Sequence, residues 1–179
     1  MLIVAIIIAV VIAGLSFAMS SQPETFRMER SRLINAPADR LFGLVNDFHQ
    51  WQQWSPWEKI DPAMQRTFSG PASGDGSSYA WAGNRKAGEG RMVIRESQPS
   101  DRVAIDLHFL KPFKASNLTE FTFTPEASGT RVTWAMSGAN TAVTRAMSLV
   151  ASMDKMVGKD FERGLANLAD VAEASRVTS

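Results

Sequence analysis

Six short segments with the character of β-strands follow one another between residues 64 and 137. Clusters of Gly, Pro, Asn, Asp and Ser separate them, and no helical pattern lies inside the series. Strands that succeed one another through short turns, without helical crossovers, pair antiparallel. We therefore expect an antiparallel meander with strands at residues 64–69, 77–82, 90–96, 102–110, 116–124 and 130–137.

Alternation within the segments separates the two faces of this sheet. Val103, Ile105, Leu107 and Phe109 occupy alternate positions and share one face, whereas His108 falls on the other. Residues 26–34 also alternate apolar and charged side chains, which predicts a further, half-buried strand ahead of the series. The expected sheet therefore has about seven strands and one apolar face.

Helical periodicity occurs on both sides of the six segments. Pro37 suits the first position of a helix that runs to about Phe48. The C-terminal apolar stripes are Val143, Met147 and Val150, and then Val157, Phe161, Leu165, Leu168 and Ala172. Gly158 and Gly164 would each weaken an isolated helix by ~1 kcal/mol, so tertiary packing has to hold this one. A sheet and a long amphipathic helix bury their apolar faces against each other, which predicts an α+β fold.

An apolar run without any ionisable side chain occupies residues 2–19, and the first charged residue is Glu24. A helix over this run rises roughly 27 Å, close to the ~30 Å hydrocarbon core of a bilayer. We therefore predict an N-terminal transmembrane helix, with an anchor at residues 1–20, a polar linker at 21–25 and one folded domain at 26–179.

A cleaved signal peptide and a buried core helix are the alternatives for this run. Signal peptides have a basic start and small residues before the cut, but here no Lys or Arg precedes the run and residues 17–20 form a poor cleavage site. Arg27, Arg30 and Arg32 follow the run, and cationic residues beside a span tend to stay cytoplasmic. We expect a single-pass membrane protein with its domain on the cytoplasmic side.

The inventory of reactive side chains is small. The formal net charge is +1, from 19 basic and 18 acidic residues without a basic block, so a nucleic-acid partner is not expected. The chain has no cysteine, which excludes disulfides and thiolate chemistry. The only histidines, His49 and His108, stand outside any metal-ligand spacing, so we predict neither a metal nor a cofactor.

A series of short motifs runs through the domain. They are Ala36-Pro37-Ala38, Val45-Asn46-Asp47, Trp54-Ser55-Pro56-Trp57, Tyr79-Ala80-Trp81-Ala82-Gly83-Asn84, Gly88-Glu89-Gly90-Arg91-Met92, Gly129-Thr130-Arg131-Val132-Thr133-Trp134 and Gly158-Lys159-Asp160-Phe161-Glu162-Arg163-Gly164-Leu165. In this order and spacing, over about residues 26–174, they resemble the START-like or SRPBCC superfamily, in its bacterial polyketide cyclase/dehydrase and lipid transport branch. The resemblance implies the helix-grip fold, a curved sheet around a long C-terminal helix with an apolar cavity between them. It does not imply one reaction.

Such a cavity would enclose a hydrophobic or amphipathic small molecule, lipid- or polyketide-like. We predict that the binding residues provide apolar enclosure and that no catalytic residue is among them. The predicted binding residues are Trp54, Trp57, Tyr79, Trp81, Met92, Ile94, Ile105, Phe109, Phe121, Phe123, Trp134, Met136 and Phe161. Trp51 is interpreted as ordinary core.

Two other functions stay open at this point. A cyclase or dehydratase of a polyketide-like substrate needs an acid–base pair in the cavity, and Asp154 with Tyr79 is the best available. Asp154 is interpreted as a cap of the last helix, and the alternative is a carboxylate that faces the cavity. The third hypothesis is a protein-interaction module that docks a membrane partner through an exposed apolar face.

Overall fold

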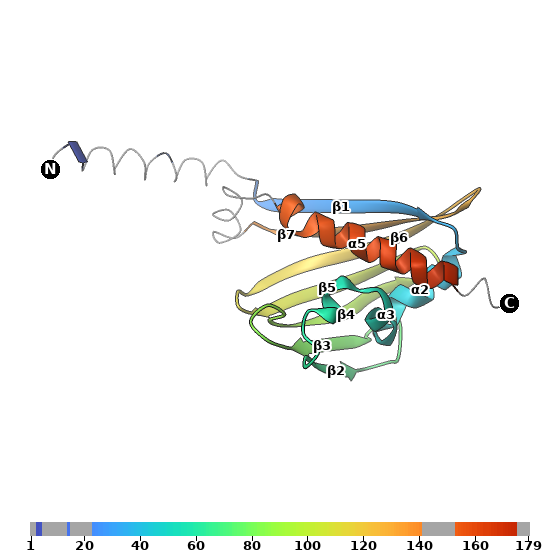
Figure 1. The fold of residues 1–179 in the computed structure, drawn as a ribbon, viewed down its shortest axis with the longest axis horizontal. Helices are drawn as coiled ribbons and strands as arrows, with labels where there is room; N and C mark the ends of the chain where they lie inside the picture. Colours follow the sequence, from blue (N-terminus) through green and yellow to red (C-terminus); the bar gives the residue numbers. More distant parts are fainter. Residues whose placement is uncertain (1–2, 5–13, 15–22, 141–152, 175–179) are drawn as a thin grey trace.

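The computed structural model of the chain describes residues 3–4, 14, 23–140 and 153–174 (Figure 1). The predicted transmembrane helix at 2–19 lies almost entirely outside these residues, and so does the short stripe of Val143, Met147 and Val150. Within the described residues, no helix combines the length and the apolar character needed to cross a membrane.

The described domain is built on a seven-stranded antiparallel sheet. Its strands are β1 (Thr25–Ile34), β2 (Gln65–Ser69), β3 (Ser78–Ala82), β4 (Glu89–Gln98), β5 (Arg102–Lys111), β6 (Ala115–Glu126) and β7 (Gly129–Ala139). They lie in the order β1-β7-β6-β5-β4-β3-β2. Strands β2 to β7 therefore form the predicted meander, and its last strand, β7, pairs with β1. Each predicted strand is confirmed with small shifts at its ends.

The helices differ from the prediction mainly at their boundaries. The first is α2 (Ala38–Asn46), which is followed by a 3-10 turn at Phe48–Gln50, by α3 (Trp51–Trp54) and by a second 3-10 turn, η2 (Pro56–Lys59). The first helix ends at Asn46, slightly before the predicted end at about Phe48, because Asp47 adopts an extended conformation. The Asp47 side chain accepts a hydrogen bond from the backbone N–H of His49, which starts the 3-10 turn instead.

The long C-terminal helix α5 (Met153–Ala174) packs on one face of the sheet. Figure 1 shows α5 lying along the curved sheet beside β1, with α2 and α3 covering the same side. The stripe Phe161, Leu165, Leu168 and Ala172 is buried against sheet residues such as Trp134. The predicted α+β architecture of a curved sheet on a C-terminal helix is thus confirmed.

The two glycines inside α5 allow close contacts with the sheet. A Cβ on Gly164 would lie 2.6 Å from Cζ3 of Trp134, and a Cβ on Gly158 would collide with the Arg30 guanidinium. These residues lower the helix propensity of α5 but let the sheet approach its backbone. Tertiary packing therefore stabilises the helix, as the sequence requires.

One end of the sheet gathers several segments that are far apart in the sequence. Thr25 at the start of β1 pairs with Ala139, Glu89 pairs with Lys111, and the turn at 83–88 lies between β3 and β4. The turn at 112–114 lies there too, between β5 and β6. We call this the proximal end, and we call the opposite end, which contains Leu33, the distal end.

Candidate functional site

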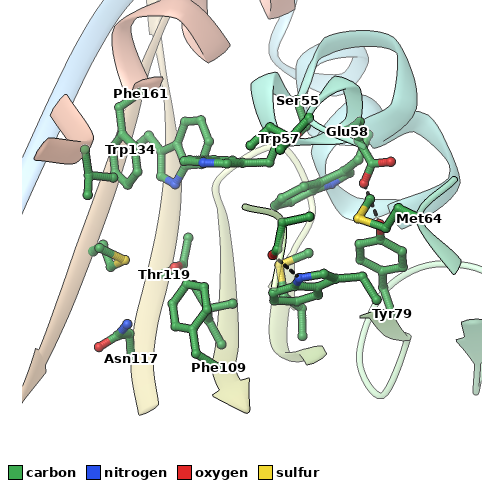
Figure 2. Close-up of a pocket in the computed structure, with 18 of the residues that line it drawn as sticks. Ser55, Trp57, Glu58, Met64, Tyr79, Phe109, Asn117, Thr119, Trp134 and Phe161 are labelled. Atoms are coloured by element: carbon green, nitrogen blue, oxygen red, sulfur yellow. Dashed lines mark hydrogen bonds between the residues drawn. The ribbon is translucent and has the colours of Figure 1, made fainter. Parts of the chain in front are cut away.

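A pocket of about 280 Å³ lies between the sheet, η2 and the first turns of α5. This volume is close to the lower limit of roughly 300–1,000 Å³ for small-molecule sites. Its wall is formed by Trp51, Ser55, Trp57, Glu58, Ile60, Met64, Tyr79, Trp81, Lys86, Ala87, Met92, Leu107, Phe109, Asn117, Thr119, Trp134, Met136, Val157 and Phe161. The wall is mainly apolar and rich in aromatic side chains (Figure 2). Ile60 and Lys86 are exposed wall residues and mark where the pocket meets solvent.

The pocket occupies only the proximal half of the space between helices and sheet. On β5, Leu107 and Phe109 line it, whereas Ile105, nearer the distal end, is fully buried core. On α5, Phe161 lines it and Leu165 does not. Helix α2 fills the distal half with buried apolar side chains. The apolar face of the sheet therefore lines the pocket at the proximal end and packs directly against helices at the distal end.

Most of the predicted binding residues meet in the pocket wall: Trp57, Tyr79, Trp81, Met92, Phe109, Trp134, Met136 and Phe161. The others, Trp54, Ile94, Ile105, Phe121 and Phe123, are buried in the core outside the wall. They lie on the predicted face of their strands or on α3, but nearer the distal half. Phe123, for example, packs edge-on against Phe42 of α2 at 6.0 Å between ring centroids.

Two tryptophans of α3 differ in their relation to the pocket. Trp51 is buried in the core, as interpreted from the sequence, and it also lines the pocket. Trp54, predicted to bind ligand, is buried beside it and donates its indole N–H to the Leu44 carbonyl oxygen at 2.9 Å. Trp134 stacks on Phe161 at 4.2 Å and meets Trp57 edge-on at 5.4 Å between ring centroids. These rings form the part of the wall between α5 and β7.

A buried polar chain closes another side of the pocket. The Tyr79 hydroxyl donates to Oε1 of Glu58 at 2.6 Å, and Nε of Arg66 donates to Oε2 of the same carboxylate at 2.7 Å (Figure 2 shows Tyr79 and Glu58). Burial and the bond to Glu58 raise the pKa of Tyr79 above its ordinary value. Glu58 thus holds η2 to β2 and β3, with both carboxylate oxygens engaged.

Glu58 was not foreseen, because η2 is a short turn without the periodicity that assigns a face. Asn117 and Thr119 were also missed, although they alternate with Phe121 and Phe123 along β6 and so share their face. They were omitted because the predicted wall consisted of apolar and aromatic residues, whereas their side chains are polar. The alternation alone would have found both residues.

The interpretation of Asp154 as a helix cap is wrong. Asp154 lies inside the first turn of α5, and its carboxylate accepts bonds from Nη1 and Nη2 of Arg30 at 2.7 and 2.9 Å. The Arg30 guanidinium lowers the pKa of Asp154, and more than half of the Asp154 side chain is exposed. The alternative, a carboxylate in the cavity, is wrong as well, because Asp154 is not part of the pocket wall.

The histidines also lie outside the pocket. His108 is on the opposite face of β5, as the alternation predicts, and its Nδ1 lies 2.9 Å from Oγ of Ser116. His49 contacts Asp47 through Nδ1 at 2.8 Å. Among the residues that the structure describes, no three His, Asp or Glu side chains are arranged to hold a metal ion.

A family model described as polyketide cyclase / dehydrase and lipid transport matches residues 25–173. The chain belongs to this family. The sequence resemblance is therefore confirmed, over the same span in which the sheet and α5 enclose the pocket. The polyketide cyclase/dehydrase and lipid transport family joins binding and catalytic descriptions, so membership alone does not choose between them. No curated protein matches the chain.

Solved structures show the same fold. SA2116 from Staphylococcus aureus, of unknown function, has a TM-score of 0.62 at 13% identity, over 86% of this chain and 96% of its own. A protein from Rhizobium leguminosarum has a TM-score of 0.60 at 16% identity, over 84% and 96%. The di-domain ARO/CYC protein BexL of the BE-7585A biosynthetic pathway has a TM-score of 0.60 at 15% identity, over 88% and 53%. At these identities the likeness concerns the fold.

Proposed function

We propose that this domain binds a hydrophobic or amphipathic small molecule, lipid- or polyketide-like, in the pocket between the sheet and α5. The observation that carries the proposal is the mainly apolar wall, rich in aromatic side chains, around about 280 Å³ of space. Burial of apolar surface against such a wall is the main source of affinity for apolar ligands. An intact pocket of this kind also argues against a pure protein-interaction module, for which a collapsed cavity is expected.

Catalysis is the second candidate, because Glu58 and Tyr79 place a carboxylate and a phenol in the pocket wall. Both groups are already committed, however. Glu58 accepts from Tyr79 and Arg66, and the raised pKa of Tyr79 holds its proton on the phenol. A general base has to direct an oxygen at substrate, whereas the two oxygens of Glu58 are directed at Tyr79 and Arg66, so the geometry favours binding over turnover.

We further propose that residues 2–19 hold the domain at a membrane, with the domain on the cytoplasmic side. The support is the charge-free run itself, followed by Arg27, Arg30 and Arg32. Thr25, where β1 begins, is at the proximal end, and the pocket lies in that same half of the domain. A ligand that partitions into a bilayer would therefore have a short path to the pocket.

The binding proposal is tested by filling the pocket. Leu107→Trp adds bulk to the wall, and we expect it to weaken binding of the fluorescent probe 1-anilinonaphthalene-8-sulfonate at least about tenfold, since an overfilled apolar site loses its contacts. Leu33→Trp adds the same bulk at the distal end, where Leu33 is 38% exposed, and should leave binding unchanged. Equal binding by both variants, with melting temperatures that show folded protein, would contradict the proposal.

A further inference from the structure

Two buried polar atoms of the pocket wall have no hydrogen-bond partner within the described part of the chain: Oγ1 of Thr119 and Nε1 of Trp134. Thr119 is only 3% exposed and Trp134 only 2%. The indole N–H groups of Trp51, Trp54 and Trp81, in contrast, each donate to a backbone carbonyl oxygen. A buried polar atom without a partner costs folding free energy, so such a pair calls for a reason.

The two atoms belong to neighbouring strands and to the same face of the sheet. Thr119 of β6 pairs with Met136 of β7, and Trp134 pairs with Phe121, so the two polar residues are diagonal neighbours. Figure 2 shows the nitrogen edge of Trp134 turned toward Thr119 inside the pocket. They thus form one polar spot in an apolar surrounding.

The chemistry of the spot selects a type of ligand atom. An indole N–H only donates, whereas a threonine hydroxyl donates or accepts. A carbonyl oxygen can accept from both groups, and a ligand hydroxyl can accept from Trp134 while it donates to Thr119. Among the described wall residues, the one cationic side chain is Lys86, which is exposed at the mouth. A carboxylate at the spot would be buried without a counter-charge, which is far more costly than a neutral oxygen.

We infer that Thr119 and Trp134 form the polar subsite of the pocket, and that the ligand is an apolar molecule carrying an uncharged oxygen, a carbonyl or hydroxyl, inserted toward this pair. The inference rests on the proposed binding function and narrows the class of ligand. Plain hydrocarbons and molecules that must insert a carboxylate are excluded from the favoured class.

Ligand access to the pair requires a small movement. Both atoms are closed to water, so a ligand oxygen reaches them when a neighbouring apolar side chain shifts. Met136 lies in the wall opposite Thr119 in the strand register, and its unbranched thioether chain adapts readily to a new shape.

The test uses three probes with one naphthalene body: 2-acetylnaphthalene, 2-ethylnaphthalene and 2-naphthoate. Affinities are measured by calorimetry on the full chain in lipid nanodiscs, with empty nanodiscs as the blank. We expect the ketone to bind about tenfold more tightly than the ethyl compound, as one satisfied hydrogen bond allows. Thr119→Val and Trp134→Phe should each reduce the ratio of ketone affinity to ethyl-compound affinity several-fold. Both variants should still bind 2-ethylnaphthalene.

Thr133→Val is the matched control, because Thr133 lies beside Trp134 on the opposite face of β7 and its hydroxyl contacts Ser31 at 3.0 Å. It should leave the ratio unchanged. Unliganded Thr119→Val should melt at an equal or higher temperature, because it removes a buried hydroxyl that has no hydrogen-bond partner in the described part of the chain. If 2-acetylnaphthalene and 2-ethylnaphthalene bind equally well, the inferred subsite is wrong but the proposed binding function stands. The same holds if 2-naphthoate binds most tightly of the three and Trp134→Phe abolishes its binding. Failure of all three probes would overturn the proposed function itself.

Discussion

At the scale of single residues, the contacts of Tyr79 decide its chemistry. It is the only tyrosine of the chain, it is almost fully buried, and its hydroxyl donates to Glu58. Burial and the neighbouring carboxylate both disfavour the phenolate, and they raise the pKa of Tyr79. The folded protein therefore keeps a proton that the unfolded chain releases near pH ~10.

This difference gives a direct prediction for pH. Because the pKa of Tyr79 is raised in the folded state, the contribution of the protonated phenol to the free energy of unfolding is complete below pH ~10. This contribution declines as the pH rises further. Tyrosinate absorbance at 295 nm should stay low in the native protein at pH 10.5 and appear in urea-denatured protein near pH ~10. A native chain that titrates like the denatured one would contradict the buried Tyr79–Glu58 bond. Tyr79→Phe supplies the baseline, because it contains no tyrosine.

At the scale of elements, α5 depends on packing more than on its own propensity. Gly164 lies under Trp134, and an added Cβ would also lie 3.2 Å from Cδ of Pro56. At the start of the helix, Arg30 of β1 bonds Asp154 and also Glu162 at 2.7 Å, which ties the first turns of α5 to the edge strand. The position of the helix over the pocket is thus set by contacts with the sheet.

Two glycine substitutions separate propensity from packing. Gly164→Ala should destabilise the domain by about 1–3 kcal/mol, because the new methyl group overpacks against a ring already stacked on Phe161. Gly43→Ala in α2 is the matched control, since nothing lies within 4 Å of its added Cβ, and it should stabilise by up to ~1 kcal/mol. Urea unfolding of both variants measures the two changes. Equal shifts would mean that Trp134 does not pack on the α5 backbone.

At the scale of the whole molecule, the start of β1 at Thr25 and the pocket both lie in the proximal half of the domain. At this end, Leu110 near the end of β5 is 46% exposed, and Phe113 in the turn between β5 and β6 is 60% exposed, with Lys111 and Lys114 on either side of it in the sequence. Exposed apolar side chains between cations suit the boundary between a bilayer and its anionic headgroups. A domain anchored through residues 2–19 would bring this turn to the membrane surface.

Site-specific labelling tests this orientation, because a chain without cysteine accepts one label per introduced cysteine. We expect the fluorophore NBD at Phe113→Cys to shift to the blue when the full chain is placed in vesicles with anionic lipid. The same label at Leu33→Cys, at the distal end, should keep its emission in water. A shift at residue 33, or at neither position, would contradict the proposed approach to the membrane.

Local patterns in the sequence were sufficient for the elements of this fold. A period of two places side chains such as Leu107 and Phe109 on one face whatever the rest of the chain does, and turn residues end each strand locally. The meander, its apolar face and the stripe of α5 could therefore be predicted, and so could the solvent side of His108. The curvature of the sheet and the presence of a cavity were predicted from the resemblance to the family.

Only the tertiary structure decided which part of that apolar face is open. Alternation assigns Ile105 and Phe109 to the same face but carries no information on depth along the strand, because that depends on where α2 and α3 pack. The partners of Glu58 and Asp154 depend in the same way on segments distant in sequence. Thr119 and Trp134, whose buried polar atoms have no hydrogen-bond partner among the described residues, become diagonal neighbours only through the register of β6 and β7. Faces are local properties of the chain, whereas the pocket and its polar subsite arise from long-range packing.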